Sequence, residues 1–379
     1  MKLLYIYEYS DNDPVSAKGD FLWGKTRQCL RELAQKNGKD FHCDIARGLF
    51  HKRINGGTAW RRIANLLWMH VSAPIKLLLY RPDVVFVRTS PPLIQMTYLF
   101  WGKLFGARVY PWIMDYHPVF GARSTQKGTL QNKIWSLFDK LDAALLPWAA
   151  KAVCLDENMG DLIRERSRGR LQAFVCPTFA LNEVEPLDLA KKKASVDQIS
   201  FLYAGTLGRS HKTDILEKLL ARLSKKTKVT LSYCGRTKDA PARLKKIADA
   251  ANAQFKSYSF IEKYEDLGKF YKEKGFDWGI VLLNEELAGV VSPSKFSGYT
   301  SFGLPIVYIG PDRTNAHMIC KKFGAGIAIC DPEEIDDAVQ KFLNPETQPQ
   351  MASNTAASRT YFSADAAKRL AEFLYGEMY

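Results

Sequence analysis

The chain has 379 residues, 46% hydrophobic and 25% charged, which excludes both a single small core and an intrinsically disordered protein. Its seven scattered cysteines form no C-x-x-C pair, which favours reduced core thiols in a cytosolic protein over a disulfide framework. The net charge of +14 indicates an anionic partner, but we find no nucleic-acid-binding motif and expect no nucleic-acid partner.

The basic excess is concentrated in the first half of the chain. Residues 1–180 hold 26 basic and 15 acidic residues, and residues 51–100 hold seven basic residues and one acid, Asp83. That window also contains Trp60, Arg61, Arg62, Leu66, Leu67, Trp68, Ile75, Lys76, Leu77 and Leu78. This mixture is typical of a segment that lies on an anionic membrane, and the alternative is an amphipathic helix with a solvated basic face.

A transmembrane helix and a signal peptide are not expected. The longest apolar stretch, 63–80, is interrupted by polar residues and proline, and it does not reach the roughly 20 apolar residues of a spanning helix. The amino-terminal residues 1–6 lead directly into a predicted strand, 2–7. We therefore expect a cytoplasmic protein that associates peripherally with the inner face of the cell membrane.

The first half reads as alternating strands and helices. After strand 2–7, residues 10–24 predict a polar loop and residues 25–37 a helix. Next come strand 83–87, helix 93–105 capped by Gly106, and strand 108–114, with Asp115 and His117 directly after it. Ligands of open α/β sheets bind beyond the carboxyl ends of strands, so both residues are candidates for chemistry. For His117 the alternative is an ordinary loop histidine.

The first half is completed by the predicted helix 135–148, strand 151–155, a helix capped by Asp156 and a strand end at 175–178. The polar residues 183–198 indicate a linker, so the domain boundary is placed near residue 185. The second half predicts strand 199–203, helix 214–224, strand 227–234, strand 255–261, helix 264–274 and strand 276–283, and the chain ends with helices 331–343 and 363–379.

A glycine-rich stretch follows strand 199–203. The small residues Gly205, Thr206 and Gly208 allow backbone N–H groups to approach a phosphate. Arg209 and Lys212 can neutralise a diphosphate. This stretch therefore predicts a site for a phosphorylated ligand.

Residues 290–311 predict a loop, a short helix and a buried strand. Ser292 and Ser294 bracket Pro293 in a helix-start signature, with Lys295 in the first turn, and the apolar run 306–309 predicts a parallel strand covered on both faces. A helix start with a lysine indicates an anion site. The alternative is an ordinary αβ unit whose lysine is solvated.

The run PSKFSGYTSFGLPI, residues 293–306, resembles the donor-site helix of the retaining GT-B glycosyltransferases of family 4. FLYAGTLGR (201–209), FDWGIVLL (276–283), PDVVFVRTSPPL (82–93) and VYPWIMDYHP (109–118) resemble further segments of that family in the same order. The resemblance implies an α/β protein with the GT-B fold, two Rossmann-like doubly wound domains facing each other across a cleft. Residues 1–184 would bind the acceptor and face the membrane, residues 185–360 would bind the nucleotide sugar, and residues 361–379 would form a helix that crosses back to the first domain.

The resemblance also implies roles for the candidate residues. The catalytic candidates are Arg209, Lys212, Asp115 and His117; the donor-binding candidates are Gly205, Thr206, Gly208, Gly235, Glu286, Ser292, Ser294 and Lys295; the acceptor-side candidates are Lys18 and Gly19. Two departures stand out. A common family arginine coincides with Thr206, and two family glutamates coincide with Val290 and Gly298. The candidate replacements for the first glutamate are Glu285, Glu286 or the backbone N–H groups of residues 289–292.

The resulting hypothesis is a hexosyltransferase that moves a sugar from a nucleotide-diphosphate donor to a hydroxyl of a lipid-linked or oligosaccharide acceptor in bacterial surface polysaccharide synthesis. The expected donor is a UDP-sugar. Retention without a protein nucleophile, no cofactor and no metal are expected from the family, and Asp11-Asn12-Asp13 sits in a predicted surface loop rather than in a metal motif. The alternatives are a nucleotide-sugar epimerase with the GT-B fold and a non-catalytic GT-B subunit that binds a partner enzyme.

Overall fold

The computed structural model describes residues 1–7, 17–49, 59–89, 91–177, 185–187, 196–208, 211, 213–261 and 264–379, with only the backbone described for residues 17–21, 59, 62, 264 and 265. The chain forms two compact units. Unit 1 comprises residues 1–177, 289–292 and 364–379, and unit 2 comprises residues 178–288 and 293–363. The described residues of each unit form one six-stranded parallel sheet with helices on both faces, as predicted for two doubly wound α/β domains.

Unit 1 is built around a sheet with the strand order β2-β1-β3-β4-β5-β6. The strands are β1 (Lys2–Ile6), β2 (His42–Ala46), β3 (Val84–Arg88), β4 (Arg108–Ile113), β5 (Ala152–Cys154) and β6 (Ala173–Val175). The helices are α1 (Ala17–Lys36), α2 (Ala59–Val71), α3 (Ala73–Tyr80), α4 (Ile94–Phe105), α5 (His117–Ser124), α6 (Leu130–Leu145), the 3-10 helix η1 (Leu146–Trp148), α7 (Glu157–Arg166) and α15 (Ala364–Met378).

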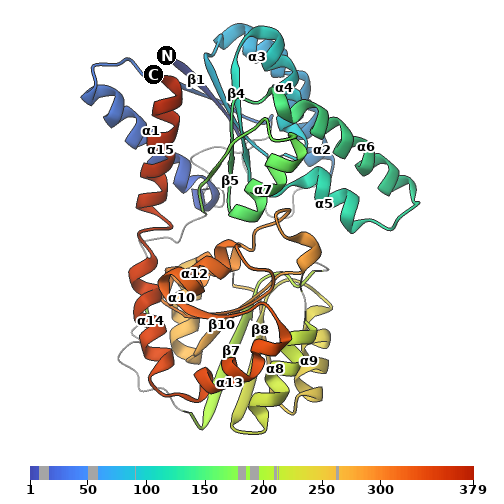
Figure 1. The fold of residues 1–379 in the computed structure, drawn as a ribbon, viewed down its shortest axis with the longest axis vertical. Coiled ribbons are helices and arrows are strands. Elements are labelled where there is room, and N and C mark those ends of the chain that lie inside the picture. Colours follow the sequence, from blue (N-terminus) through green and yellow to red (C-terminus); the bar gives the residue numbers. More distant parts are fainter. Residues whose placement is uncertain are drawn as a thin grey trace. The chain divides into compact units, whose positions relative to one another are not determined.

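The strand order decides which helices share a face of this sheet. The chain moves in one direction from β1 to β2 and in the other direction in all later crossovers, and right-handed crossovers therefore place α1 on one face and α2 to α7 on the opposite face. The terminal helix α15 packs against α1. Figure 1 shows this division, with α1 and α15 on one side of the sheet and α2, α4 and α6 on the other.

Unit 2 has the strand order β12-β11-β10-β7-β8-β9. Its strands are β7 (Gln198–Ala204), β8 (Lys228–Cys234), β9 (Gln254–Tyr258), β10 (Trp278–Leu282), β11 (Ile306–Ile309) and β12 (Gly326–Ile329). Its helices are α8 (Asp214–Ser224), α9 (Ala240–Ala250), α10 (Tyr264–Lys274), α11 (Lys295–Ser301), α12 (Asn315–Phe323), α13 (Ile335–Leu343) and α14 (Thr347–Ser358), with 3-10 helices η2 (Glu285–Leu287) and η3 (Pro332–Glu334). All four residues of β11 are buried between β10 and β12, as expected for a strand covered on both faces.

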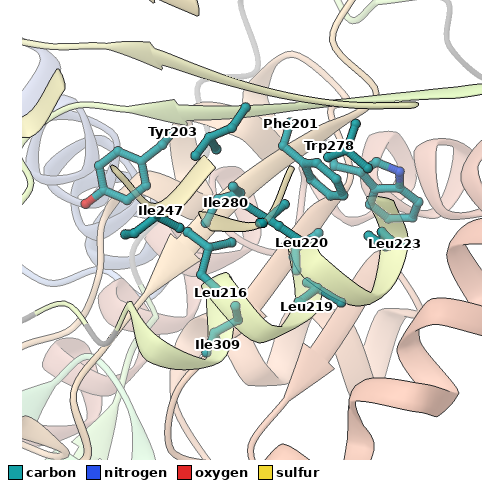
Figure 2. Close-up of a cluster of buried hydrophobic side chains, with 14 of the residues drawn as sticks. Phe201, Tyr203, Leu216, Leu219, Leu220, Leu223, Ile247, Trp278, Ile280 and Ile309 are labelled. Atoms are coloured by element: carbon teal, nitrogen blue, oxygen red, sulfur yellow. The ribbon is translucent and has the colours of Figure 1, made fainter. Parts of the chain in front are cut away.

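The core of unit 2 forms where α8 covers the sheet. Figure 2 shows Leu216, Leu219, Leu220 and Leu223 directed from this helix toward side chains of the strands, and all four are buried. Their spacing places them on one face of the helix, which explains why α8 folds against the sheet. Tyr203 lies at one end of the cluster, near the carboxyl end of β7.

An aspartate ties neighbouring strands together at the amino edge of each sheet. In unit 1, the Asp83 carboxylate accepts a hydrogen bond of 2.8 Å from the backbone N–H of Lys2. In unit 2, the Asp277 carboxylate accepts one of 2.8 Å from the N–H of Ser200. Asp277, at the start of the predicted strand 276–283, therefore has a structural role at the edge away from the carboxyl ends.

Some predictions of element bounds and burial differ from the structure. Helix α1 begins at Ala17, so the predicted loop 10–24 is wrong in its second half, because Leu22 and Trp23 are buried and the indole of Trp23 stacks 4.1 Å from the ring of Tyr5. Helix α6 begins at Leu130 rather than 135, where the Thr129 side chain accepts a bond from the backbone of Asn132. Of the seven cysteines, all free, Cys29, Cys43 and Cys330 are only partly buried, so the prediction of core thiols fits the other four.

Candidate functional site

Two glycines bring loops together at the carboxyl edge of the unit 2 sheet. Gly205 follows β7 with a φ of 106°, and its N–H donates a 2.7 Å hydrogen bond to the carbonyl of Cys234 at the end of β8. A Cβ on Gly235 would lie 2.3 Å from the carbonyl oxygen of Gly205. Only glycine fits at both positions, since Gly205 needs a positive φ and Gly235 leaves no room for a side chain. The predicted donor-binding glycines thus have a packing reason of their own.

Lys295 lies over this junction. Its Cε is 3.4 Å from the position that a Cβ on Gly205 would take, and its Nζ is 5.2 Å from the centroid of the Tyr203 ring. Burial lowers the pKa of Lys295 from 10.5 to about 8, because the desolvated ammonium is less stable than in water. The side chain remains mostly charged at neutral pH and presents its charge where β7 ends, which is the location expected for a phosphate-binding group.

His211 contacts the same lysine. Its Nε2 lies 3.1 Å from Nζ of Lys295, and its Nδ1 lies 2.8 Å from the backbone N and 3.2 Å from the backbone O of Gly208. Burial, together with the nearby charges of Lys295 and Arg243, lowers the pKa of His211 to about 4. The imidazole is therefore neutral at pH 7. The sequence reasoning missed His211, although its place between Arg209 and Lys212 in the glycine-rich stretch was a usable signal.

Two proton arrangements satisfy these contacts. When Lys295 is an ammonium, it donates to Nε2, and the proton on Nδ1 is donated to the Gly208 carbonyl. When Lys295 is a neutral amine, Nε2–H donates to it, and Nδ1 accepts the Gly208 N–H. In the first arrangement the imidazole does not accept the Gly208 N–H, so a backbone donor lies beside the lysine cation.

Tyr299 fixes α11 against β7. Its hydroxyl accepts a 2.7 Å hydrogen bond from the N–H of Ala204 and donates one of 3.1 Å to the carbonyl of Leu202. Gly279 on β10 makes room for the ring, because a Cβ there would lie 2.5 Å from Cγ of Tyr299. The tyrosine four residues after the lysine in the sequence motif therefore positions the helix that carries Lys295.

The other donor-binding candidates of unit 2 lie in less enclosed places. Thr206 is exposed and its carbonyl accepts a 2.8 Å bond from the Tyr203 hydroxyl. Glu286 is exposed in η2. Ser294 occupies the N-cap position of α11, but its side chain makes no capping bond and Pro293 precedes the helix, so the predicted capping geometry is wrong. The N-cap φ of −77° and ψ of −9° are helical, and the extended backbone needed for a side-chain cap is not adopted.

Several candidates fall outside the described residues. Arg209 and Lys212 do, as do Asp11-Asn12-Asp13, so their roles stay predictions from the sequence. Lys18 and Gly19 lie within α1 rather than in the predicted loop, and their side chains are outside what the structure describes.

A second polar cluster lies at the carboxyl edge of the unit 1 sheet. The guanidinium of Arg88, the last residue of β3, lies 4.9 Å from the ring centroid of Tyr7 and 5.6 Å from that of Trp112. Asp115 is exposed, yet desolvation by the surrounding protein raises its pKa, against the effects of His117 and Arg88. Burial lowers the pKa of His117, and Asp115 opposes that shift. The sequence reasoning missed Arg88, whose signal was a basic residue at the carboxyl end of a parallel strand.

Residues 289–292 also belong to unit 1, beside this cluster. The carbonyl of Val290 accepts a 2.7 Å hydrogen bond from the N–H of Tyr116, and Val291 forms a β-bridge with Asp115. Ser292 is buried here, so the two predicted donor-binding serines fall in different units. Val290 is fully buried, so the position that the resemblance assigns to the first glutamate holds a core side chain. At the second, Gly298, a Cβ would face open space.

Comparisons with known proteins identify the fold. No protein-family model and no curated protein matches the sequence. Among solved structures, sucrose-phosphate synthase from Thermosynechococcus elongatus aligns with a TM-score of 0.63 at 13% identity over 100% of this chain and 99% of that chain. The lipopolysaccharide outer core galactosyltransferase WaaB aligns with 0.59 at 14% identity over 99% of both chains.

HepE from Anabaena, in complex with UDP, aligns with a TM-score of 0.60 at 12% identity over 99% of this chain and 100% of that chain. The same protein in complex with UDP-glucose aligns with 0.58 at 13% identity over 99% and 100%. Coverage of whole chains on both sides means that the order of both units is shared. The protein therefore has the GT-B glycosyltransferase fold.

Proposed function

We propose that this protein is a retaining glycosyltransferase of the family 4 type that transfers a hexose from a UDP-sugar to a hydroxyl of a lipid-linked glycan acceptor, at the cytoplasmic face of the membrane, in bacterial surface polysaccharide synthesis. The observation that carries the proposal is the position of Lys295, which lies over Gly205 and bonds to His211 at the carboxyl edge of the unit 2 sheet. A cation beside a glycine turn suits a diphosphate. The choice of UDP is supported by the neighbours that hold UDP or UDP-glucose.

The proposed chemistry is transfer of the anomeric carbon. The bond between that carbon and the diphosphate oxygen breaks, a bond to the acceptor oxygen forms, and the acceptor hydroxyl gives up its proton to the departing diphosphate. Negative charge grows on the diphosphate as the sugar becomes oxocarbenium-like, and Lys295 stabilises that charge electrostatically, with Arg209 and Lys212 as further cations predicted from the sequence. The reaction is proposed to need no metal and no protein nucleophile.

The acceptor is proposed to bind at the carboxyl edge of the unit 1 sheet. Asp115 and His117 follow β4 there, and Arg88 ends the adjacent β3. A carboxylate and an imidazole can orient a sugar hydroxyl by hydrogen bonds, and Arg88 can pair with an anionic group of the acceptor. Asp115 and His117 therefore keep the catalytic-side roles proposed from the sequence, with Arg88 added.

A transfer assay tests this proposal. UDP-glucose and UDP-galactose carrying a labelled sugar would be incubated with a polyprenyl-diphosphate-linked saccharide, and lipid-linked product and released UDP would be quantified. We expect acceptor-dependent UDP release by wild type and by Lys225→Ala, an exposed lysine after α8, and at least 100-fold slower release by Lys295→Ala. Equal rates for the two variants would contradict the role of Lys295.

The missing family glutamates favour one rival, a non-catalytic GT-B subunit. Val290 is buried and Gly298 carries no side chain, so neither position offers a carboxylate. Such a subunit would bind no nucleoside diphosphate and would show no transfer in the same assay. The other rival, an epimerase, would convert the labelled donor without any acceptor.

A further inference from the structure

One face of unit 1 carries nearly all of the large apolar side chains that the described residues expose. Seventeen of twenty lie on α2, α3, α4, η1 and α6. They are Trp60, Ile63, Leu67, Trp68, Val71, Ile75, Leu78, Leu79, Tyr80, Phe100, Leu104, Phe105, Leu130, Ile134, Leu137, Leu141 and Trp148, which we call the apolar face. Leu79 is 76% exposed and Leu130 is 74% exposed, so these side chains stand in solvent. An apolar surface of this extent marks an interaction site.

The elements that carry this face form one continuous layer. Helix α4 packs against α2, α3, α6 and η1, and all of them cover the same face of the unit 1 sheet. Helix α6 shows the arrangement clearly, because Leu130, Ile134, Leu137 and Leu141 follow a helical repeat and are all exposed. Helices normally direct such a stripe inward. Here the outer surface of the layer is apolar. The sequence predicted a membrane-facing apolar surface only for the segment that forms α2 and α3.

The exposed charges on this layer are basic. Lys103, Lys133 and Lys140 are exposed on α4 and α6, Arg61 on α2 and Lys76 on α3 are half-buried, and α2, α3 and α4 contain no acidic residue. The two acids of α6 are bound within the protein: the side chain of Asp142 is fully buried, and both Asp139 and Asp142 pair with Arg166. The layer therefore combines apolar, aromatic and positive side chains, which is the composition of surfaces that lie in an anionic lipid interface.

Membrane-spanning helices are a separate matter. In the described part of the chain, no single helix has the length and apolar composition to cross a membrane, while residues 63–71 of α2 and α3 together meet that criterion as a pair bent by 46°.

We propose that the apolar face docks on an anionic lipid bilayer, with the tryptophans and leucines of α2, α3, α4 and α6 in the interface between headgroups and acyl chains and the lysines and arginines on the headgroups. A second copy of the chain fits less well, because a twofold contact through this face would place its basic residues against one another. The proposal needs no catalytic residue, so it stands apart from the proposed sugar transfer and extends the membrane contact to α4, η1 and α6.

Vesicle flotation of the full chain tests this docking. The vesicles would contain phosphatidylcholine with or without 30 mol% phosphatidylglycerol, at low salt. We expect wild type to float with the anionic vesicles and at least fivefold less with the neutral ones. Leu137→Glu on α6 should reduce the floated fraction at least fivefold, and Leu79→Glu with Leu137→Glu at least tenfold. Leu49→Glu, which changes an exposed leucine outside the apolar face, should stay within twofold of wild type.

Three results would overturn the proposal. If wild type does not bind the anionic vesicles, the apolar face does not dock on lipid. The folding of the double variant is checked by circular dichroism and thermal melting. If the folded double variant floats like wild type, another surface of the protein binds the vesicles. If wild type is a dimer in the absence of lipid and Leu137→Glu converts it to a monomer, the apolar face serves self-association instead. UDP affinity of the same variants is expected within twofold of wild type, so a failure of docking and a failure of the sugar-transfer proposal are read separately.

Discussion

The Nζ of Lys295 lies 3.1 Å from Nε2 of His211, a contact between residues 84 positions apart in the sequence. The imidazole is neutral at pH 7 because burial and nearby cations lower its pKa to about 4. Among the described residues, Lys295 thus contacts a neutral imidazole and the ring of Tyr203, and neither of these competes with a phosphate for its charge. A cation positioned in this way before a ligand arrives supports diphosphate binding without a large reorganisation.

The first prediction concerns the pH dependence of UDP binding. The pKa of Lys295 is lowered to about 8, so its charge is present below pH 8 and is lost as the pH rises above it. If the ammonium binds the diphosphate, the affinity for UDP should fall by up to about tenfold per pH unit between pH 8 and 9.5. Isothermal titration calorimetry at half-unit intervals measures this slope.

The matched control is Lys295→Ala, whose affinity should be weaker and flatter over that range. An identical slope in the variant would assign the titration to another group and would remove Lys295 from the diphosphate site.

The second prediction concerns stability in acid. The pKa of His211 is lowered from 6.5 to about 4, so between these pH values His211 is protonated in the unfolded chain and neutral in the folded protein. The contribution of this site is unchanged above pH 6.5, and it lowers stability progressively as the pH falls from 6.5 to 4, by up to roughly 3 kcal/mol. His211→Gln should therefore lose less unfolding free energy than wild type between pH 7 and 4.5 in urea titrations. Parallel losses in both proteins would show that His211 stays accessible to protons.

The third prediction compares two glycines of unit 2. A Cβ on Gly235 would lie 2.3 Å from a backbone oxygen, whereas one on Gly298 would meet open space inside α11. Gly235→Ala should lower the free energy of unfolding by about 2 kcal/mol or more through forced backbone shifts. Gly298→Ala should raise it by about 0.5–1 kcal/mol, because alanine loses less conformational entropy in a helix. Urea unfolding measures both, and a destabilised Gly298→Ala would mean that this position is crowded.

The fourth prediction concerns the buried ion pair of unit 1. Arg166 donates 3.3 Å and 3.1 Å hydrogen bonds to the Asp142 carboxylate and the Tyr116 hydroxyl. Tyr116 also donates a 2.7 Å bond to Asp142, and it adjoins the candidate residues Asp115 and His117. Arg166→Met should cost about 3–5 kcal/mol of unfolding free energy, because it leaves a buried carboxylate without its cation.

The control lies on the same helix. Arg164 pairs with Asp161 at the surface, where the two side chains are 65% and 40% exposed, so Arg164→Met should change stability by less than about 0.5 kcal/mol. Similar costs for the two variants would show that the Asp142 site is hydrated.

Much of the fold could be predicted because local pattern and tertiary packing agree. Helix 214–224 and strand 306–309 match the structure at both ends, since each has an apolar pattern of its own period between clear boundaries. The start of α1 was missed because glycines suggested a loop, while burial of Leu22 and Trp23 against other elements favours helix. Helix α14 was missed because its small and polar residues and Pro349 give no such pattern.

The candidate site was predictable only where a single segment carries it. The glycine-rich stretch and Lys295 each stand out locally, and the structure brings Gly205 and Lys295 together. His211 and Arg88 each carried only a weak local signal, because the contacts that place them in the candidate sites come from residues distant in the sequence. The apolar face was predicted for α2 and α3 alone, because an apolar stripe on α6 is read as a core face until the fold shows that it is exposed.

The measurement that tests the central claim most directly is a calorimetric titration of the wild-type protein, Lys295→Ala and Lys225→Ala with UDP, GDP, ADP, TDP and CMP at pH 7. We predict that UDP binds most tightly, that Lys225→Ala matches wild type, and that Lys295→Ala weakens UDP binding by about 10- to 100-fold, which corresponds to the loss of a charge-assisted hydrogen bond. No binding of any nucleotide by the wild type would contradict the account and favour a non-catalytic GT-B subunit.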